Sequence, residues 1–345
     1  MISLRRVCLD MRLWSFFVGI LMVMMLRYSD GQEAPAGAGD RKHWSELPVI
    51  GIMAQETQKE DLKKQGNSII NGMPVKFLQM GAMRVVPIRL HKTEAYYKQL
   101  FGYLNGLLLP GGSINVTGNE YWRVGNYFFN WAKQAFDKGD YFPIFGICLG
   151  FEFLNTVVAE KDPLSACDSV KFLDPFRPIK DFRESRIFEN MPRSVISTLV
   201  KRNATAHYHH DCVATDDFIK DKKLMDFYRV VSTNQDRNGK SFISTIEAYD
   251  YPFYGFQWHP EKYGYHLNIH SLVPHDHAAL EVGMKFANFF FNETMKSGHR
   301  FPMPDVLSAL MIDRINPVYF GSPSFRSAWL FNDYPDVKNN ANNRL

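Results

Sequence analysis

The chain has 345 residues, of which 46% are hydrophobic, so it is long enough for one large domain or two ordinary ones with a substantial core. Lysine and arginine number 40 against 36 acidic residues, and this small formal charge of +4 gives no sign of a nucleic-acid-binding surface. Only four cysteines are present, which excludes a small scaffold held together by disulfides.

The N-terminal segment differs in composition from the rest of the chain. Arg5, Arg6 and Arg12 precede an apolar run over residues 13–26, which is shorter than a typical bilayer span. Small and polar residues suited to cleavage follow this run. We therefore predict a signal peptide over residues 1–31 and no membrane attachment after its removal; an uncleaved N-terminal anchor is the alternative.

A secretory signal gives meaning to three Asn-x-Thr sequons in the chain. They begin at Asn115, Asn203 and Asn292. Such triplets often arise by chance, but behind a signal peptide we expect at least one of them to carry a glycan.

Composition divides the rest of the chain into three parts. Residues 32–46 are rich in Gly, Ala, Pro and charged side chains and predict a flexible lead-in. Residues 47–333 hold alternating strand and helix patterns and are expected to form one domain. Residues 334–345 form a polar, Asn-rich tail that we expect to fray.

Within the domain, short apolar runs alternate with segments of helical periodicity. Strands are expected at residues 48–53, 84–88, 106–109, 141–147, 242–248 and 252–258, and helices at 75–83, 127–136, after Cys148 and at 276–296. Residues 160–240 are less regular, with prolines that mark loops or excursions, and the aromatic stretch 318–331 is expected to pack back on the domain. Continuous apolar runs separated by helices favour a mostly parallel sheet covered on both faces, so the predicted fold is α/β with three layers.

The most informative motif is Gly-Ile-Cys-Leu-Gly-Phe-Glu at residues 146–152, between an expected strand and an expected helix. A Gly-x-Cys-x-Gly turn is the thiol version of the nucleophile elbow, in which small residues permit a turn too tight for a Cβ atom. The dipole of the following helix favours the thiolate over the thiol. We therefore predict that Cys148 is a nucleophile; a buried structural cysteine is the alternative.

A second apolar strand ends in the sequence Gln-Trp-His-Pro-Glu at residues 257–261. In an open α/β sheet, catalytic groups lie at the carboxyl ends of strands, where Cys148 and His259 are both expected. Glu261 would orient the far nitrogen of the imidazole, as the logic of a catalytic triad requires. The alternatives are a histidine that caps a strand end and a solvated surface carboxylate.

Two glycines supply a candidate oxyanion hole. Gly111 and Gly112 follow the expected strand at residues 106–109, and a backbone N–H from this loop can join that of Leu149 at the elbow. The spacing does not decide which glycine donates. An ordinary turn is the alternative.

The remaining cysteines leave one question open. Cys8 lies in the predicted signal peptide, so a free thiol at Cys148 leaves Cys167 and Cys212 as the only pair. A disulfide and two separate buried thiols are equally compatible with the sequence.

The motifs at residues 110–112, 146–152 and 257–261 closely resemble those of gamma-glutamyl hydrolases, the folylpolyglutamate hydrolases, and the similarity runs from about Pro48 to Asn332. This resemblance implies the flavodoxin-like sandwich of the class I glutamine amidotransferase-like superfamily. It also implies a Cys–His–Glu triad that cleaves γ-glutamyl amide bonds of folylpoly-γ-glutamates through a thioester, without a cofactor. A lysosomal or extracellular location and, by analogy alone, a homodimer are further implications.

The resemblance adds two residues to the expected site. Amidotransferases usually carry Gln where this chain has Glu152, whose carboxylate would pair with the α-ammonium of a γ-linked glutamate; stabilising the helix dipole is the alternative. His209 resembles a histidine that the family places near the active site. It lies among three histidines in residues 207–210, but no accompanying ligand pattern supports a metal there.

One stretch departs from the family pattern. Residues 67–74 read Asn-Ser-Ile-Ile-Asn-Gly-Met-Pro where family members are rich in Tyr and Ala, so an active-site tyrosine is missing, with Ser68 or Ile69 in its region. Two other functions therefore stay open. One is a secreted glycoprotein that binds folate polyglutamates with little or no cleavage, and the other is a glutaminase that releases ammonia for a synthase.

Overall fold

The structure is a computed structural model, and it describes residues 47–266, 271–322 and 325–333. The predicted signal peptide, lead-in and polar tail lie outside the described residues. The α-helices are α2 (Glu60–Lys63), α3 (Gly72–Met80), α4 (Glu94–Tyr103), α5 (Glu120–Phe136), α6 (Leu149–Ala159), α7 (Arg193–Lys201), α8 (Thr215–Lys220), α9 (Lys222–Phe227), α10 (His277–Thr294) and α11 (Pro304–Leu310). Single 3₁₀ turns are η1 (Phe182–Glu184), η2 (Pro260–Lys262) and η3 (Ile312–Arg314).

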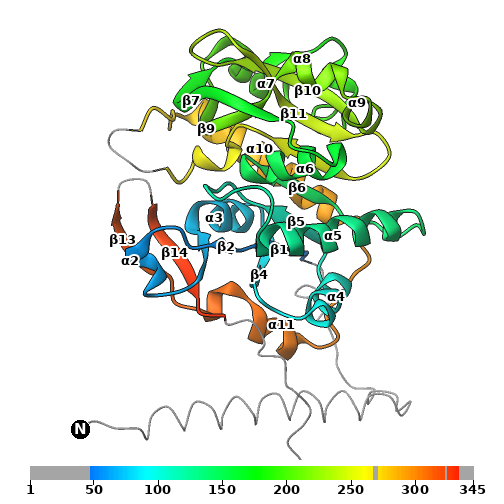
Figure 1. The fold of residues 1–345 in the computed structure, drawn as a ribbon, viewed down its shortest axis with the longest axis vertical. Helices are drawn as coiled ribbons and strands as arrows, with labels where there is room; N and C mark the ends of the chain where they lie inside the picture. The colour runs from blue at the N-terminus through cyan, green and yellow to red at the C-terminus, as the bar shows by residue number, and fades with distance from the viewer. Residues whose placement is uncertain (1–46, 267–270, 323–324, 334–345) are drawn as a thin grey trace, which may run out of the picture. The chain divides into compact units, whose positions relative to one another are not determined.

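An eight-stranded sheet forms the centre of the fold (Figure 1), in the order β4-β1-β5-β6-β12-β11-β10-β8. Its strands are β1 (Val49–Met53), β4 (Arg84–Ile88), β5 (Gly106–Leu109), β6 (Ile144–Ile147), β8 (Arg177–Pro178), β10 (Tyr228–Gln235), β11 (Ser241–Ala248) and β12 (Phe253–Phe256). The first five strands in this order are parallel, and the last three continue the sheet antiparallel. In chain order the parallel strands run 2-1-3-4-5, which is the flavodoxin-like order.

Helices cover both faces of this sheet. Phe290 of α10 stacks on Phe145 of β6, with ring centroids 3.9 Å apart, so α10 packs on one face together with α3 and α7. On the other face α6 lies so close to the sheet that a Cβ on Gly255 would come within 2.9 Å of Phe151. The predicted α/β fold with three layers is confirmed.

Two smaller sheets flank the core. One has the order β13-β14-β3-β2, and the other pairs β7 with β9. Their strands are β2 (Gln55–Glu56), β3 (Ser68–Asn71), β7 (Leu164–Asp174), β9 (Thr205–Val213), β13 (Val318–Ser322) and β14 (Phe325–Phe331). The aromatic C-terminal stretch does pack back, since β14 pairs antiparallel with β3.

The segment of residues 160–240, which the sequence indicated only as less regular with loops or excursions at its prolines, holds several regular strands. It contains the eleven-residue strand β7, its partner β9 and strand β10. Register shifts interrupt the pairing of β7 with β9 at two places, and fully exposed and buried positions of β7 alternate only over residues 166–169. Bulges of this kind remove the two-residue periodicity by which a strand is found in a sequence.

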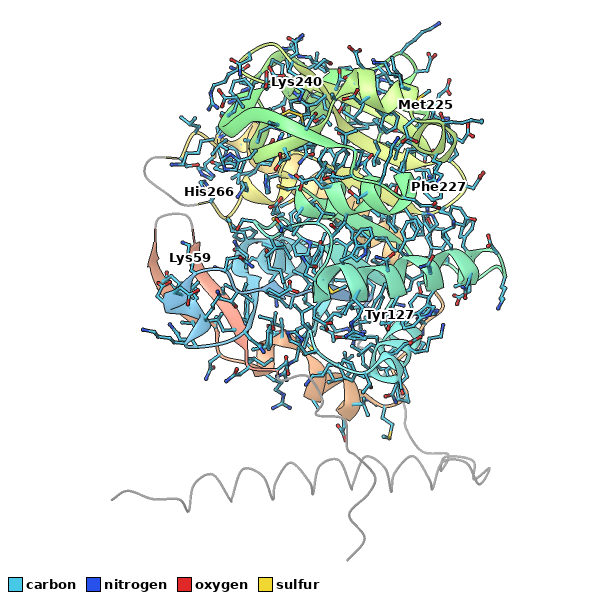
Figure 2. All side chains as sticks on the ribbon, in the orientation of Figure 1. Lys59, Tyr127, Met225, Phe227, Lys240 and His266 are labelled. Carbon is cyan, nitrogen blue, oxygen red and sulfur yellow. A yellow bond between two sulfur atoms is a disulfide. The ribbon has the colours of Figure 1, made fainter. Side chains whose placement is uncertain are left out.

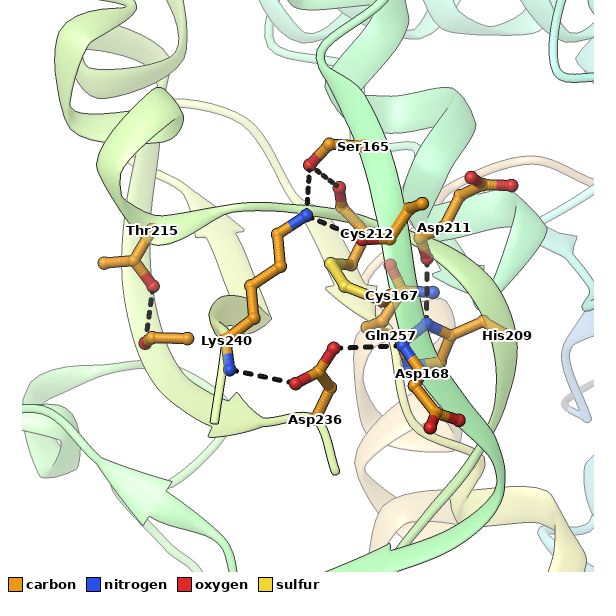
Figure 3. Close-up of a disulfide and its surroundings, with 12 residues drawn as sticks. Ser165, Cys167, Asp168, His209, Asp211, Cys212, Thr215, Asp236, Lys240 and Gln257 are labelled. Atoms are coloured by element: carbon orange, nitrogen blue, oxygen red, sulfur yellow. Dashed lines mark hydrogen bonds between the residues drawn. A yellow bond between two sulfur atoms is a disulfide. The ribbon is translucent and has the colours of Figure 1, made fainter. Parts of the chain in front are cut away.

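A disulfide joins these two strands (Figure 3). It links Cys167 of β7 to Cys212 of β9, whose Cα atoms are 5.9 Å apart. Lys240 supports the same region by donating to the Ser165 hydroxyl at 2.8 Å and to the Ala166 carbonyl at 2.7 Å. The question that the sequence left open is therefore answered in favour of the pair.

The described helices differ from membrane-spanning helices in length and character. None of those within residues 47–266, 271–322 and 325–333 combines the length and the apolar character that a bilayer crossing needs.

Candidate active site

Three neighbouring parallel strands end together and position the candidate residues. Leu109 of β5 pairs with Gly146 of β6, and Ile147 of β6 pairs with Phe256 of β12. The glycine loop, the cysteine and the histidine each follow one of these strands, so they meet at the carboxyl edge of the sheet. Open α/β sheets bind their ligands at this edge.

The turn at Cys148 has the geometry of a nucleophile elbow. Cys148 has φ 54° and ψ −106°, a backbone conformation that costs energy for a residue with a side chain. A Cβ on Gly146 would lie 2.4 Å from the Gly150 carbonyl oxygen, and one on Gly150 would lie 2.1 Å from the Leu109 carbonyl oxygen. Both glycines are therefore needed for α6 to start this close to the sheet.

His259 and Glu261 form a buried pair. His259 Nδ1 lies 2.7 Å from Glu261 Oε1, and the two side chains are only 6% and 4% exposed. The other ring nitrogen, Nε2, is buried and has no hydrogen-bond partner among the described residues. Because an ionised carboxylate only accepts, Nδ1 carries the proton and Nε2 is left as a proton acceptor.

Cys148 and His259 lie next to each other across Gly111. A Cβ on Gly111 would lie 2.9 Å from His259 Cε1 and 3.2 Å from Cys148 Cβ. These two atoms are therefore separated by no more than the sum of the two distances. Cys148, His259, Glu261 and both loop glycines line one cavity.

Burial dominates the ionisation of the cysteine and the histidine. It raises the pKa of the Cys148 thiol well above its usual value, and the carboxylates of Glu152 and Glu261 act in the same direction. The Leu149 N–H at the start of α6 lowers this pKa, which is the direction predicted from the helix dipole, but burial outweighs it. Burial also lowers the pKa of His259. The resting pair is thus a neutral thiol beside a neutral imidazole.

Glu261 stays ionised in spite of its burial. Burial alone would raise its pKa, but the electrostatic attraction and hydrogen bond of the His259 ring, together with the charge of Lys262, outweigh that effect, and the net shift is downward. A carboxylate that remains charged holds the His259 ring in one tautomer.

Glu152 lies beneath the site, in the first turn of α6. Its Oε1 accepts from Gln257 Nε2 at 3.1 Å, and burial raises the pKa of Glu152 to about 7. Glu152 is not among the described residues that line the cavity. Its carboxylate therefore acts on Cys148 through its charge rather than by facing the cavity.

Side chains from β2 support the candidate oxyanion loop. Gln55 Nε2 donates to the Gly111 carbonyl at 3.1 Å, and a Cβ on Gly112 would overlap Gln55 Oε1. Gly112 therefore has no room for a side chain, and the loop is held in one conformation beside Leu149.

The cavity has a volume of about 570 Å³ and receives residues from segments far apart in the chain. Lys59 and His266, which both line it, lie on the same side of the molecule in Figure 2. Tyr208, Lys171 and Lys262 also line the cavity, and no sequence motif points to them. No spacing rule in a single sequence separates these side chains from other Lys, Tyr and His residues.

The stretch that departs from the family pattern borders this cavity. Ile69 and Asn71 of β3, followed by Met73 and Pro74, line it, whereas Ser68 is buried on the opposite side of the strand. Of the two residues suggested in place of a tyrosine, Ile69 therefore faces the cavity.

His209 lies on β9, behind the residues that line the cavity. Its Nε2 is 3.1 Å from His207 Nδ1, its Nδ1 is 2.8 Å from the Asp211 carbonyl oxygen, and burial lowers its pKa to about 3. The neighbouring Tyr208 faces the cavity instead and contacts the His259 ring edge to face. Within the described part of the chain, no group of His, Cys, Asp and Glu side chains is arranged to hold a metal ion.

The three sequon asparagines all lie at the surface. Asn115 is in the loop after β5, Asn203 precedes β9, and Asn292 lies near the end of α10. Each of the three is exposed and accessible to a glycan.

A cysteine at a strand-to-helix elbow beside a buried His–Glu pair is the arrangement of an enzyme that forms a thioester, on a flavodoxin-like sheet. The chain belongs to the peptidase C26 family, whose model matches residues 48–261. It is 36% identical to the gamma-glutamyl hydrolase of Rattus norvegicus, over 88% of this chain and 95% of that protein. The gamma-glutamyl hydrolase of Homo sapiens is 37% identical, over 82% and 89%.

Solved structures align with lower similarity. The glutaminase domain of Trypanosoma brucei CTPS with bound acivicin is 13% identical, with a TM-score of 0.44, over 74% of this chain and 97% of that one.

Proposed function

We propose that this chain is a cysteine hydrolase that cleaves γ-glutamyl amide bonds of folylpoly-γ-glutamates. The observation that carries the proposal is the buried His259 imidazole, which has one nitrogen on Glu261 and its other nitrogen free, next to Cys148 in a cavity. Relatives named gamma-glutamyl hydrolase, matched over most of both chains, support this choice of substrate bond.

The first half of the reaction acylates the enzyme. Cys148 transfers its proton to His259 Nε2 as the sulfur attacks the γ-carbonyl carbon, and the oxyanion accepts from the Leu149 N–H and from the Gly111-Gly112 loop. The C–N bond then breaks, and His259 returns the proton to the leaving amine. The product is a thioester on Cys148 and a shortened polyglutamate.

The second half releases the acyl group. His259 takes a proton from water, the resulting hydroxide attacks the thioester carbon, and the C–S bond breaks. The sulfur recovers its proton from His259. Bonds and protons balance without a cofactor, and Glu261 holds the imidazole in place throughout.

Glu152 and His209 enter this proposal as positioning residues. Glu152 fixes Gln257 and adds negative charge behind Cys148, and His209 supports β9, from which Tyr208 reaches the cavity. Pairing of Glu152 with a substrate ammonium would require it to become accessible from the cavity.

We infer further that the protein enters the secretory pathway and reaches the lysosome or the extracellular space. The apolar N-terminal segment and the exposed sequon asparagines support this location. A homodimer is inferred from family analogy alone. Light scattering of the purified mature protein, before and after glycosidase treatment, tests both the assembly and the glycans.

Product analysis tests the proposed reaction. Purified protein is incubated with a defined pteroylpenta-γ-glutamate, and the products are identified by mass. We expect shortened pteroylglutamates and released glutamyl fragments, and neither with Cys148→Ala. Cleavage that survives this substitution would overturn the proposal, and so would binding without any cleavage by the wild type. Ammonia released from free glutamine at a higher rate would favour a glutaminase.

A further inference from the structure

The cavity contains a buried lysine that the proposed reaction does not use. Lys262 directly follows Glu261 in η2, is 7% exposed and lines the cavity. Its ammonium group lies 4.4 Å from the centre of the Tyr208 ring. Among the described residues, this group makes no hydrogen bond and no ion pair.

An unpaired buried ammonium is an unusual feature. Removing a cation from water is costly unless an anion or hydrogen-bond acceptors replace the lost solvation. The face of Tyr208 replaces only part of it. The carboxylate of the preceding residue, Glu261, is already hydrogen-bonded to His259. An anion that enters the cavity would supply the missing partner.

The other cavity lysines differ from Lys262 in position. Lys59 and Lys171 are both exposed at the cavity, where solvent and salt weaken their attraction for an anion. Lys262 is buried together with Cys148, His259 and Glu261, so its field is screened least where the bond is cleaved. It is therefore the cation best placed to select a charge next to the scissile bond.

A γ-glutamyl linkage brings carboxylates to this position. The glutamyl unit that acylates Cys148 keeps a free α-carboxylate three carbons from the scissile carbonyl. The leaving glutamate carries another on the carbon that bears the scissile nitrogen. In an ordinary α-linked peptide the α-carboxyl groups of both residues are themselves part of amide bonds, so a cation that binds a free α-carboxylate here would distinguish the two linkages.

We propose that Lys262 is a specificity-determining residue that binds one of the two α-carboxylates flanking the scissile γ-glutamyl bond. This inference rests on the proposed function and names the group of the substrate that the site selects. The ion pair replaces water around both charges and places the γ-carbonyl at Cys148.

The experiment changes the substrate and the lysine in turn. Three pteroyl-γ-glutamyl-glutamates are compared, one unmodified and two in which one flanking α-carboxylate is replaced by a carboxamide. With the wild type we expect one carboxamide substrate to lose about 10- to 100-fold in kcat/KM, the range typical of a hydrogen bond to a charged group. Lys262→Met should reduce kcat/KM for the unmodified substrate by a similar factor and leave that carboxamide substrate unchanged.

Two controls separate substrate binding from other roles. Lys222→Met removes a lysine that is 86% exposed, paired with Asp226 and not among the residues that line the cavity, and it should change none of the three rates. If Lys262 instead acts only by stabilising the Cys148 thiolate, Lys262→Met will slow all three substrates equally and shift the pH profile of Cys148 alkylation. That result would overturn the proposal.

The wild-type comparison decides the matter even if Lys262→Met fails to fold. Equal kcat/KM for all three substrates would contradict the inference while leaving γ-glutamyl hydrolysis intact. If the wild type cleaves none of them, the proposed function fails instead. Calorimetric binding of γ-glutamyl-glutamate to Cys148→Ala, with and without Lys262→Met, then tests the inference separately: binding that is unaffected by the lysine overturns it.

Discussion

His259 Nδ1 and Glu261 Oε1 are 2.7 Å apart, and both side chains are almost completely buried. A charged hydrogen bond in such a place fixes the imidazole ring and stabilises the imidazolium that forms when the ring takes a proton. The opposite nitrogen, Nε2, has no partner among the described residues. The relationship between these two residues therefore prepares His259 to act as a base towards Cys148.

Replacing the carboxylate of this pair should reduce catalysis more than stability. In Glu261→Gln the amide can still occupy the site, but it does not hold the imidazolium, and we expect kcat to fall by about 10³-fold or more. Steady-state hydrolysis of a γ-glutamyl substrate measures the change, with circular dichroism to verify folding. Glu184→Gln, at a side chain that is 68% exposed, is the matched control. Activity within a few-fold of wild type would remove Glu261 from the mechanism.

Glu152 predicts a pH-dependent stability difference. Its pKa is raised from 4.5 to about 7 in the folded protein, so folding favours the protonated form and its contribution to stability is lost as the pH rises through 7. Since one pKa unit corresponds to about 1.4 kcal/mol, Glu152→Gln should be more stable than wild type by up to about 3 kcal/mol at pH 8. Little difference is expected at pH 4.5.

Urea unfolding of both proteins at several pH values measures this difference. Groups other than Glu152 titrate in both proteins and cancel in the comparison. The Gln side chain would also offer a donor to Gln257 Oε1, which is buried without a partner among the described residues. A difference in unfolding free energy between the two proteins that stays constant from pH 4.5 to pH 8 would contradict the raised pKa of Glu152.

The unliganded thiol should react slowly at neutral pH. Because burial raises the pKa of Cys148, we expect its alkylation by iodoacetamide to increase only at a pH above that at which a free thiol reacts. The rate is measured by mass spectrometry on the peptide that contains Cys148, with glutathione as the reference thiol. Full reactivity near pH 6 would show that a thiolate exists before substrate binds.

The elbow glycines can be tested against a glycine that has space around it. Gly150→Ala places a Cβ 2.1 Å from the Leu109 carbonyl oxygen, and we expect a loss of about 1–3 kcal/mol in unfolding free energy, or more if the backbone does not move. Gly102→Ala lies in α4 with no atom within 4 Å of the new Cβ and should stabilise by about 0.5–1 kcal/mol. Thermal unfolding measures the change in stability of both variants. Equal changes would contradict the close packing of Gly150 against Leu109.

The disulfide predicts a loss of stability when it is removed. Cys167 and Cys212 are 45 residues apart, and a loop of this length gives about 4 kcal/mol in the chain-entropy model. We expect a double Cys→Ser variant to unfold at a lower urea concentration than the wild type. Its activity should be lost before the protein unfolds globally, because β9 also positions Tyr208. Unchanged unfolding would mean that the β7–β9 pair holds without the bond.

Much of the site could be predicted because it depends on local rules. A Cys between two glycines at a strand-to-helix turn has few other conformations, and each of the strands that precede Gly111, Cys148 and His259 is a continuous apolar run. The bulged pair β7–β9 and the sheet that joins β14 to β3 were not predicted. Their pairing depends on contacts between residues distant in the chain, and their sequences lack a regular period.

The sequence by itself determined the parallel α/β core, the elbow and the identity of the chemical groups, because each follows from periodicity or from steric limits within a few residues. Only the tertiary structure decided which side chains from distant segments share the cavity, that Glu152 lies behind it, and that Lys262 is buried there with no hydrogen bond or ion pair among the described residues. The physical reason is that burial, and with it the pKa of Cys148, His259 and Glu152, is set by how the layers pack against one another.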